Sequence, residues 1–282
     1  DDNYESLRKK VEAATILGTI QSCLTDFKFL RKIWRKNCEE ERLLGVSITG
    51  VWDCPWFTHK FPALEVEKLR NHAIEVNKKW SKKLGVNPST AITCIKPSGT
   101  VSQLVNSSSG CHPRHSFWYI RRVRNDTKDP LAKIMIEAGV PYEVDKLNSE
   151  AYVFSFPMRS PPRAFTRHDI DPEMQLQMWS LLAKHWCEHK PSMTCYMPED
   201  QWPFVGSWIW ENWDMVNGIS FLPSADEGHV YEQAPYEDID EKTYKQMMAR
   251  MPKSIDWSSI IEETDNTTAS QEVACTAGEC EL

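Results

Sequence analysis

The sequence lacks any long apolar run. None of its stretches approaches the roughly 20 consecutive apolar residues of a membrane-spanning helix, and no signal-peptide pattern opens the chain. Positive charge is also in deficit, because 33 Lys and Arg against 40 Asp and Glu give a formal net charge of −7. These features predict a protein that enters no membrane and does not coat nucleic acid.

Cysteine, by contrast, is plentiful. Nine cysteines without a signal sequence predict a reducing compartment, and therefore the cytoplasm. Seven of them are scattered through apolar segments, where cysteine acts as a small core residue: Cys23, Cys38, Cys54, Cys94, Cys111, Cys187 and Cys195. The 282 residues do not begin with Met, which favours a fragment: a processed product, the downstream half of a split gene or a truncated form.

The stretch 90–105 predicts a buried strand, a tight turn and the first turn of a helix. Pro97 ends the strand because it has no N–H to donate. Gly99 is expected to adopt a backbone conformation that a β-carbon would penalise, and Ser98 or Thr100 can cap the helix. Backbone N–H groups and hydroxyls that meet at a helix N-terminus suit a phosphate. On these residues alone, an ordinary capped turn explains the pattern slightly better.

The segments before this turn predict a parallel sheet. An apolar strand over 43–50, an amphipathic helix over 64–84 and the strand and helix of 90–105 give the order β-α-β-α. From residue 256 onward the chain is polar and is expected to be mobile. Further helices are expected at 4–23, 130–139, 171–186, 202–218 and 244–251, and strands at 119–124, 153–157, 192–197 and 220–223.

Some histidines have spacings that resemble metal sites. His112 and His115 lie three residues apart, but no Cys or carboxylate follows at a matching spacing. His185, Cys187 and His189 lie close together, but Pro191 ends their helix at once, which favours a core and capping role. The sequence therefore predicts no metal site.

Four arginines lie between residues 114 and 124. Guanidinium groups at this density could bind an anionic ligand. The alternating pattern of the segment also fits the solvated face of a strand, and this second interpretation is favoured on the residues alone.

The chain ends with a cysteine pair, Cys275 and Cys280, separated by four residues. Small residues between them allow a disulfide to close, and an exposed dithiol on a tether suits thiol–disulfide exchange. Half of a zinc site is a weaker interpretation, because no second ligand pair lies nearby. A tail without a chemical role also remains open.

A series of short segments, in a fixed order, carries a resemblance to a known family. The segments are 11–19, 39–50, 96–102, 112–115, 119–124, 185–192, 218–223, 233–236 and the terminal cysteine pair. Together they resemble monomeric, adenosylcobalamin-dependent (class II) ribonucleotide reductases of the ribonucleoside-triphosphate reductase type. The resemblance covers nearly the whole chain.

The resemblance implies a fold and a reaction. The fold would be the C-terminal part of a ten-stranded α/β barrel over residues 1–255, followed by a flexible redox tail over 256–282. The reaction would convert ribonucleoside triphosphates into 2′-deoxyribonucleoside triphosphates by thiyl-radical chemistry, with adenosylcobalamin as the cofactor. A thioredoxin-type dithiol would act as the external reductant.

The resemblance also implies roles for particular residues. Cys275 and Cys280 would form the shuttle that reduces the active-site disulfide. His112 and His115 would lie near the cofactor or the substrate. The turn that holds the substrate phosphates would be Pro97, Ser98, Gly99, Thr100, Val101 and Ser102.

One departure from the family limits these implications. The finger-loop motif that carries the thiyl cysteine, Asn-x-Cys with a Glu two residues later, does not occur here, and neither reducing cysteine has a convincing counterpart. The chain is therefore expected to be inactive alone and to assemble with an N-terminal portion of the same reductase. The alternative is a non-catalytic nucleotide-binding or assembly module derived from such an enzyme.

Overall fold

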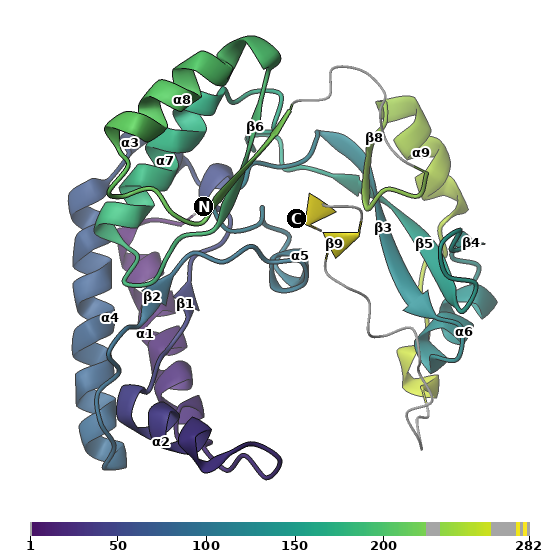
Figure 1. The fold of residues 1–282 in the computed structure, drawn as a ribbon. Helices are drawn as coiled ribbons and strands as arrows, with labels where there is room; N and C mark the ends of the chain where they lie inside the picture. The colour runs from purple at the N-terminus through teal and green to yellow at the C-terminus, as the bar shows by residue number, and fades with distance from the viewer. Residues whose placement is uncertain (1, 224–231, 261–274, 277–278, 281–282) are drawn as a thin grey trace. The chain divides into compact units, whose positions relative to one another are not determined.

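The computed structural model describes residues 2–223, 232–260, 275–276 and 279–280 (Figure 1). The chain divides into two compact units. The first contains residues 1–114 and 163–224, and the second contains residues 115–162 and 225–282. Within the described ranges, no helix is both long and apolar enough to cross a membrane.

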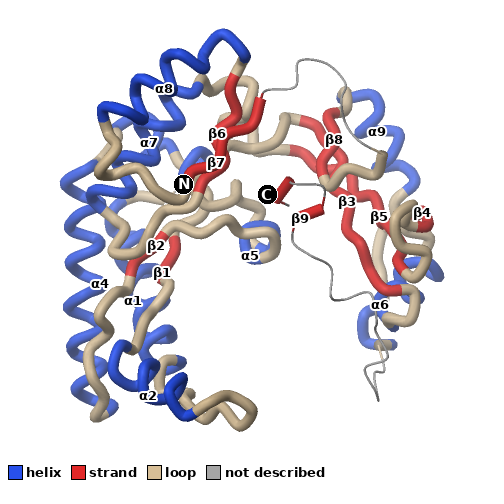
Figure 2. The backbone as a smooth tube through the Cα atoms, viewed as in Figure 1, coloured by secondary structure: helices blue, strands red, loops and turns tan. Residues whose placement is uncertain are grey.

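The first unit combines helices with short strands (Figure 2), and its strand pairs are parallel. Strand β1 (Val46–Ser47) pairs in parallel with β2 (Thr93–Cys94), and β6 (Met193–Met197) pairs in parallel with β7 (Ile219–Pro223). A parallel bridge between Ile95 and Pro191 joins the two pairs. The helices are α1 (Tyr4–Gln21), α2 (Lys32–Glu41), α3 (Pro55–Lys60), α4 (Ala63–Leu84), α5 (Val101–Leu104), α7 (Pro172–His185) and α8 (Trp202–Glu211), with 3₁₀ turns η1 (Val51–Asp53) and η2 (Glu199–Gln201).

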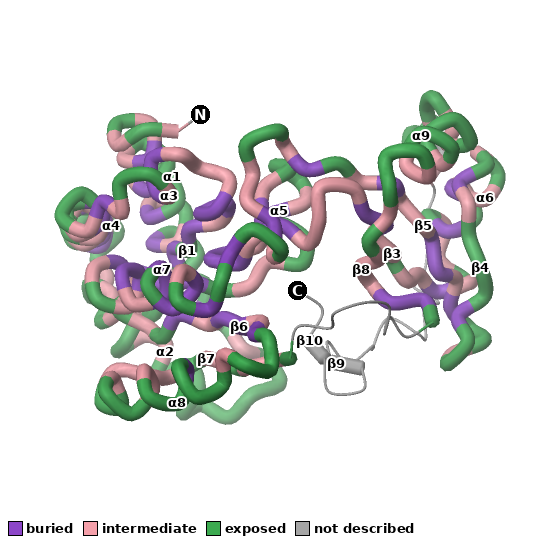
Figure 3. Tube along the Cα trace, turned by 90° about the horizontal axis from the view of Figure 1, so that it is seen from above, coloured by how far each residue is buried: buried purple, intermediate pink, exposed green. Residues whose placement is uncertain are grey.

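The core of this unit lies between the strands and helices α1, α4 and α7. The apolar positions of α4 recur at spacings of three and four, so one helix face is buried. Two fully buried tryptophans satisfy their indole N–H groups on backbone carbonyls: Trp52 Nε1 donates to Cys111 O at 2.8 Å, and Trp186 Nε1 donates to Cys94 O of β2 at 2.8 Å. Figure 3 shows the buried stretches along α7 and β6.

The second unit is built on an antiparallel sheet in the order β4-β5-β3-β8. Strands β3 (Trp118–Asp126) and β5 (Ala151–Arg159) pair along nine residues, and β4 (Tyr142–Val144) and β8 (Tyr236–Asp238) extend the sheet on either side. Phe154, which is buried, packs with residues of α6 (Pro130–Glu137). The remaining elements are α9 (Glu241–Arg250) and η3 (Trp257–Ser259).

Most predicted elements are confirmed, with two shortened helices and with the strand predicted over 43–50 reduced to Val46–Ser47. Helix α8 ends at Glu211 instead of 218, where the Asn212 side-chain amide donates to Trp208 O at 2.9 Å. Helix α5 is a single turn, and Asn106, shortly after it, has a positive φ of 48°. The mixed α/β class and the parallel β1–β2 pair are as expected. The ten-stranded barrel and the boundary at residue 255 remain predictions.

Candidate functional site

The predicted phosphate turn lies between β2 and α5 and is closed by serine hydrogen bonds. Ser98 Oγ accepts the backbone N–H of Ser102 at 2.9 Å, and Ser102 Oγ donates to Ser98 O at 2.5 Å. The Ser98 N–H donates to Ser109 Oγ at 2.7 Å. Ser98 therefore bonds to the first turn of α5, whereas Thr100 makes no side-chain cap bond.

The expectation for Gly99 is wrong in one respect. The backbone of Gly99 is not in the left-handed region, and a β-carbon there would meet nothing within 4 Å. The glycine that the geometry requires is Gly110, which has a φ of +54° and whose added β-carbon would lie 2.8 Å from Lys96 O.

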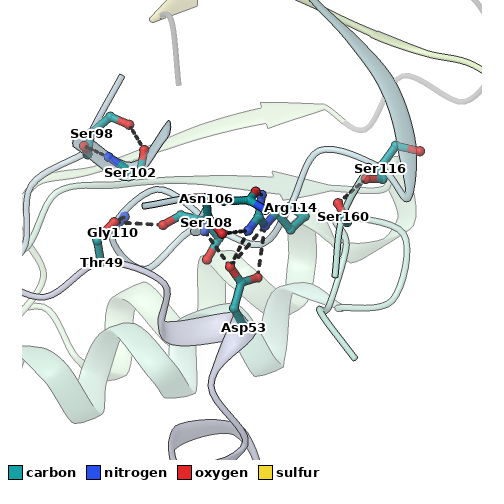
Figure 4. Close-up of polar contacts among 10 residues, drawn as sticks. All are labelled: Thr49, Asp53, Ser98, Ser102, Asn106, Ser108, Gly110, Arg114, Ser116 and Ser160. Atoms are coloured by element: carbon teal, nitrogen blue, oxygen red, sulfur yellow. Dashed lines mark hydrogen bonds and ion pairs between the residues drawn. The ribbon is translucent and has the colours of Figure 1, made fainter. Parts of the chain in front are cut away.

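A buried ion pair holds the segment 106–114, which follows α5 (Figure 4). The Arg114 side chain is 3% exposed, and its Nη2 donates to Asp53 Oδ2 at 2.8 Å while Nε lies 3.1 Å from both carboxylate oxygens. The same guanidinium donates through Nη1 to Asn106 Oδ1 at 3.2 Å and through Nη2 to Asn106 O at 2.5 Å. Asp53 Oδ2 also accepts the Ser108 N–H at 2.7 Å. The Arg114 guanidinium, at the end of the 106–114 segment, thus bonds both to Asn106 at the start of the segment and to Asp53 in η1.

Thr49 makes two hydrogen bonds to the middle of the same segment. Its Oγ1 donates to Ser108 O at 2.8 Å and accepts the Gly110 N–H at 2.9 Å. The Gly50 N–H donates to Ser108 O at 2.8 Å as well. We call residues 106–110 the polar loop. The sequence indicates a polar loop after residue 105, but it does not predict that Asp53 and Thr49 hold this loop.

His112 is buried, and both of its ring nitrogens have partners inside the first unit. Nδ1 lies 3.0 Å from Ser109 O and must donate to it, and Nε2 accepts the Thr194 N–H at 2.9 Å. Burial lowers the pKa of His112 to about 4. The ring is therefore neutral at physiological pH, with its proton on Nδ1.

His115 belongs to the second unit and has a different environment. Its Nε2 lies 2.9 Å from Asp238 Oδ1, and its ring stacks on Tyr236 with centroids 5.2 Å apart. The structure therefore places His112 and His115 in separate units with separate partners.

The arginines of β3 bond to the protein, so the interpretation as a solvated strand face is wrong. Arg121 donates to the Tyr236 hydroxyl, and Arg122 donates to Ala234 O and pairs with Glu237. Arg124 Nε donates to Asp145 Oδ2 at 2.6 Å, and its Nη2 donates to Gln233 O at 3.0 Å. These contacts attach the segment 233–237 to the sheet.

The segment 185–189 has a structural role. Glu188 Oε2 accepts the Ile92 N–H at 2.9 Å, and His189 Nε2 donates to Leu44 O at 2.8 Å. No cluster of three or more metal-ligating side chains occurs among the described residues. The favoured capping role is consistent with these bonds.

The terminal cysteines lie in two short strands, β9 (Cys275–Thr276) and β10 (Glu279–Cys280). These strands pair antiparallel, and Cys275 is the register partner of Cys280. Residues directly opposite each other in such a pair have Cα atoms about 4.5–5.5 Å apart, within the range that a disulfide spans.

Comparison with known proteins gives no match to a family model. The chain is 34% identical over 269 residues to a protein of Dictyostelium discoideum named probable adenosylcobalamin-dependent ribonucleoside-triphosphate reductase, covering 92% of this chain and 34% of that protein. It is 25% identical to the adenosylcobalamin-dependent ribonucleoside-triphosphate reductase of Lacticaseibacillus paracasei, covering 91% of this chain and 38% of that protein. The chain thus spans little more than a third of the length of these relatives.

The fold is similar to a crystal structure of a B12-dependent (class II) ribonucleotide reductase. The TM-score is 0.66 at 23% sequence identity, over 79% of this chain and 35% of that one. The resemblance seen in the sequence is therefore confirmed, for a part of such a reductase.

Proposed function

We propose that this chain is the C-terminal portion of a cytoplasmic, adenosylcobalamin-dependent ribonucleotide reductase that converts ribonucleoside triphosphates into 2′-deoxyribonucleoside triphosphates. The observation that carries the proposal is the 34% identity to a protein of that name across 92% of the chain. The remaining portion would complete the ten-stranded barrel and bring the thiyl cysteine and the two reducing cysteines.

The turn 97–102 would hold the substrate phosphates. Its serines are already ordered by their own hydrogen bonds, and among the described residues an added β-carbon at Gly99 would meet no atom within 4 Å. Backbone N–H groups and hydroxyls in such a turn bind phosphate oxygens without requiring a positive protein. This agrees with the net charge of −7.

The cysteine pair would carry reducing equivalents from a thioredoxin-type dithiol to the active site. The register of Cys275 opposite Cys280 supports this role, because the pair can close into a disulfide without a large backbone movement. In one cycle the two thiolates reduce the active-site disulfide and become a disulfide themselves, and the external dithiol then reduces it.

Adenosylcobalamin, when bound, would supply the radical that begins the chemistry. The ring of His112 is buried, and both of its nitrogens are bonded within the chain. A cofactor-binding role for His112 or His115 stays a prediction, and for His112 it would require one of these bonds to open.

Reconstitution tests the proposal. The chain is mixed with the matching N-terminal portion, adenosylcobalamin, a ribonucleoside triphosphate and a dithiol, and the deoxyribonucleotide is measured. We expect turnover from the mixture and none from either portion alone. Stable association of the two portions without turnover would contradict the proposal.

A non-catalytic nucleotide-binding module is the second candidate. It is favoured by the turn itself, which is hydrogen-bonded within this chain without the rest of a barrel. Titration of the isolated chain with ATP, alongside Ser98→Ala and Thr100→Ala, separates the two. Tight binding by the isolated chain that both variants weaken favours the module, and binding only after the other portion is added favours the reductase.

A further inference from the structure

The phosphate turn and the polar loop are connected by one side chain. Ser109 Oγ, in the polar loop, accepts the Ser98 N–H at 2.7 Å. This bond fixes the direction of the peptide group at the start of the turn. The position of Ser98 therefore depends on where the polar loop places Ser109.

The polar loop takes its own position from the Asp53–Arg114 ion pair. Asp53 accepts the N–H of Ser108, which directly precedes Ser109, at 2.7 Å, and Arg114 donates to Asn106 at the start of the loop. Both charged side chains are largely buried, with exposed fractions of 13% and 3%. A pair of this kind holds its geometry tightly because little water reaches either charge to replace the partner.

We propose that Asp53 and Arg114 are positioning residues for the substrate-phosphate turn. The ion pair sets the polar loop, the loop sets Ser109, and Ser109 sets Ser98. This inference rests on the proposed function of the turn. Arg114 acts through these neighbours and does not itself bind the phosphate, since its guanidinium is committed to Asp53 and Asn106.

The chemistry of the pair explains why these two residue types are required. A lysine at position 114 would keep the charge but could not donate to Asp53 and Asn106 at once in a planar fork. An asparagine at position 53 would leave the buried guanidinium without its counter-charge. Either change should loosen the polar loop and, through Ser109, the position of Ser98, without replacing any residue of the turn itself.

The test compares Asp53→Asn, Arg114→Lys and Ser109→Ala in the reconstituted reductase and in the chain alone. We expect the KM for the ribonucleoside triphosphate to rise about tenfold with kcat changed less than about twofold, which corresponds to about 1.4 kcal/mol of lost substrate binding. We also expect faster hydrogen exchange in peptides that cover residues 96–105. Ser109→Ala removes the hydrogen bond from the Ser98 N–H without changing the ion pair. It therefore tests the same proposal if Asp53→Asn does not fold.

Asp145→Asn is the matched control. Asp145 pairs with Arg124 at 2.6 Å and accepts the Leu147 N–H at 2.7 Å, so it is also a buried carboxylate that joins an arginine to a backbone N–H. It lies in the second unit. A comparable loss of stability is expected from this variant, with no change in the KM or in exchange at 96–105.

Two contrary results have different meanings. Unchanged KM and unchanged exchange at 96–105 in Asp53→Asn and Ser109→Ala would overturn the positioning role. Faster exchange with an unchanged KM, both in Asp53→Asn and in Ser98→Ala, would show that the turn does not bind the substrate phosphates. The ion pair would then order the turn without positioning a substrate.

Discussion

His112 accepts a hydrogen bond on Nε2 from the backbone N–H of Thr194, across 2.9 Å. The same ring donates from Nδ1 to Ser109 O. A single neutral imidazole therefore ties the end of the polar loop to strand β6. Protonation would place a second N–H against the Thr194 N–H, and two donors cannot bond to each other.

Acid should weaken the first unit through His112. The pKa of this ring is lowered from its ordinary 6.5 to about 4 by burial, so the unfolded chain binds the proton more readily. Stability is then fully present above pH 6.5 and is lost as the pH falls towards 4. We expect a loss of about 2 kcal/mol between pH 7 and pH 5, measured by urea unfolding.

The variant His112→Gln identifies the source of this loss. Glutamine has an NH₂ group that donates and a carbonyl oxygen that accepts, but it does not titrate between pH 4 and 7. The variant should be less stable than the original chain at pH 7 and should show a smaller change on acidification. An equal pH dependence in both chains would mean that other groups cause the loss.

Gly110→Ala should destabilise the chain more than Gly85→Ala. Both glycines have a positive φ, at +54° and +68°, so both substitutions carry backbone strain. Only at Gly110 would the new β-carbon approach a backbone atom, Lys96 O at 2.8 Å, whereas nothing lies within 4 Å at Gly85. We expect about 1 kcal/mol for Gly85→Ala and about 3 kcal/mol for Gly110→Ala, measured by thermal unfolding.

Thiol reactivity should follow burial. Cys111 and Cys195 are fully buried, and burial raises the pKa of each to about 12. Cys23 and Cys38 are half-buried. Iodoacetamide at pH 8, followed by peptide mass spectrometry, should modify Cys23 and Cys38 well before Cys111 and Cys195, because the thiolate is the reactive form. Early modification of Cys111 would show that the core opens locally.

Cys275→Ser should separate two kinds of reductant. In the reconstituted enzyme we expect turnover with a thioredoxin-type protein to be lost, because the protein cannot reach the active-site disulfide directly. Turnover with a small dithiol such as dithiothreitol should persist. Survival of turnover with the protein reductant would exclude the shuttle role of Cys275.

The sequence predicts those features that depend on local pattern. Apolar spacing of three and four residues identifies α1 and α4, and Asp171 followed by Pro172 marks the start of α7. The turn after β2 is also visible, because Pro97 ends the strand and Ser98 bonds to the first turn of α5. These patterns act over a few residues and need no information about the rest of the chain.

Contacts between distant segments are not visible in the same way. Asp53 and Arg114 are separated by 61 positions, and nothing in the residues around Asp53 marks it as the partner of an arginine. The four arginines of 114–124 look alike in sequence, yet the structure gives Arg114 and Arg124 carboxylate partners in different units. Only the folded chain distinguishes them.

The parallel pairs of the first unit have a practical consequence. In the described residues, β1 pairs only with β2 and β7 pairs only with β6, so each has one edge without a neighbouring strand. Exposed strand edges add strands from other molecules. Copies of this chain at high concentration are therefore expected to pair at these edges.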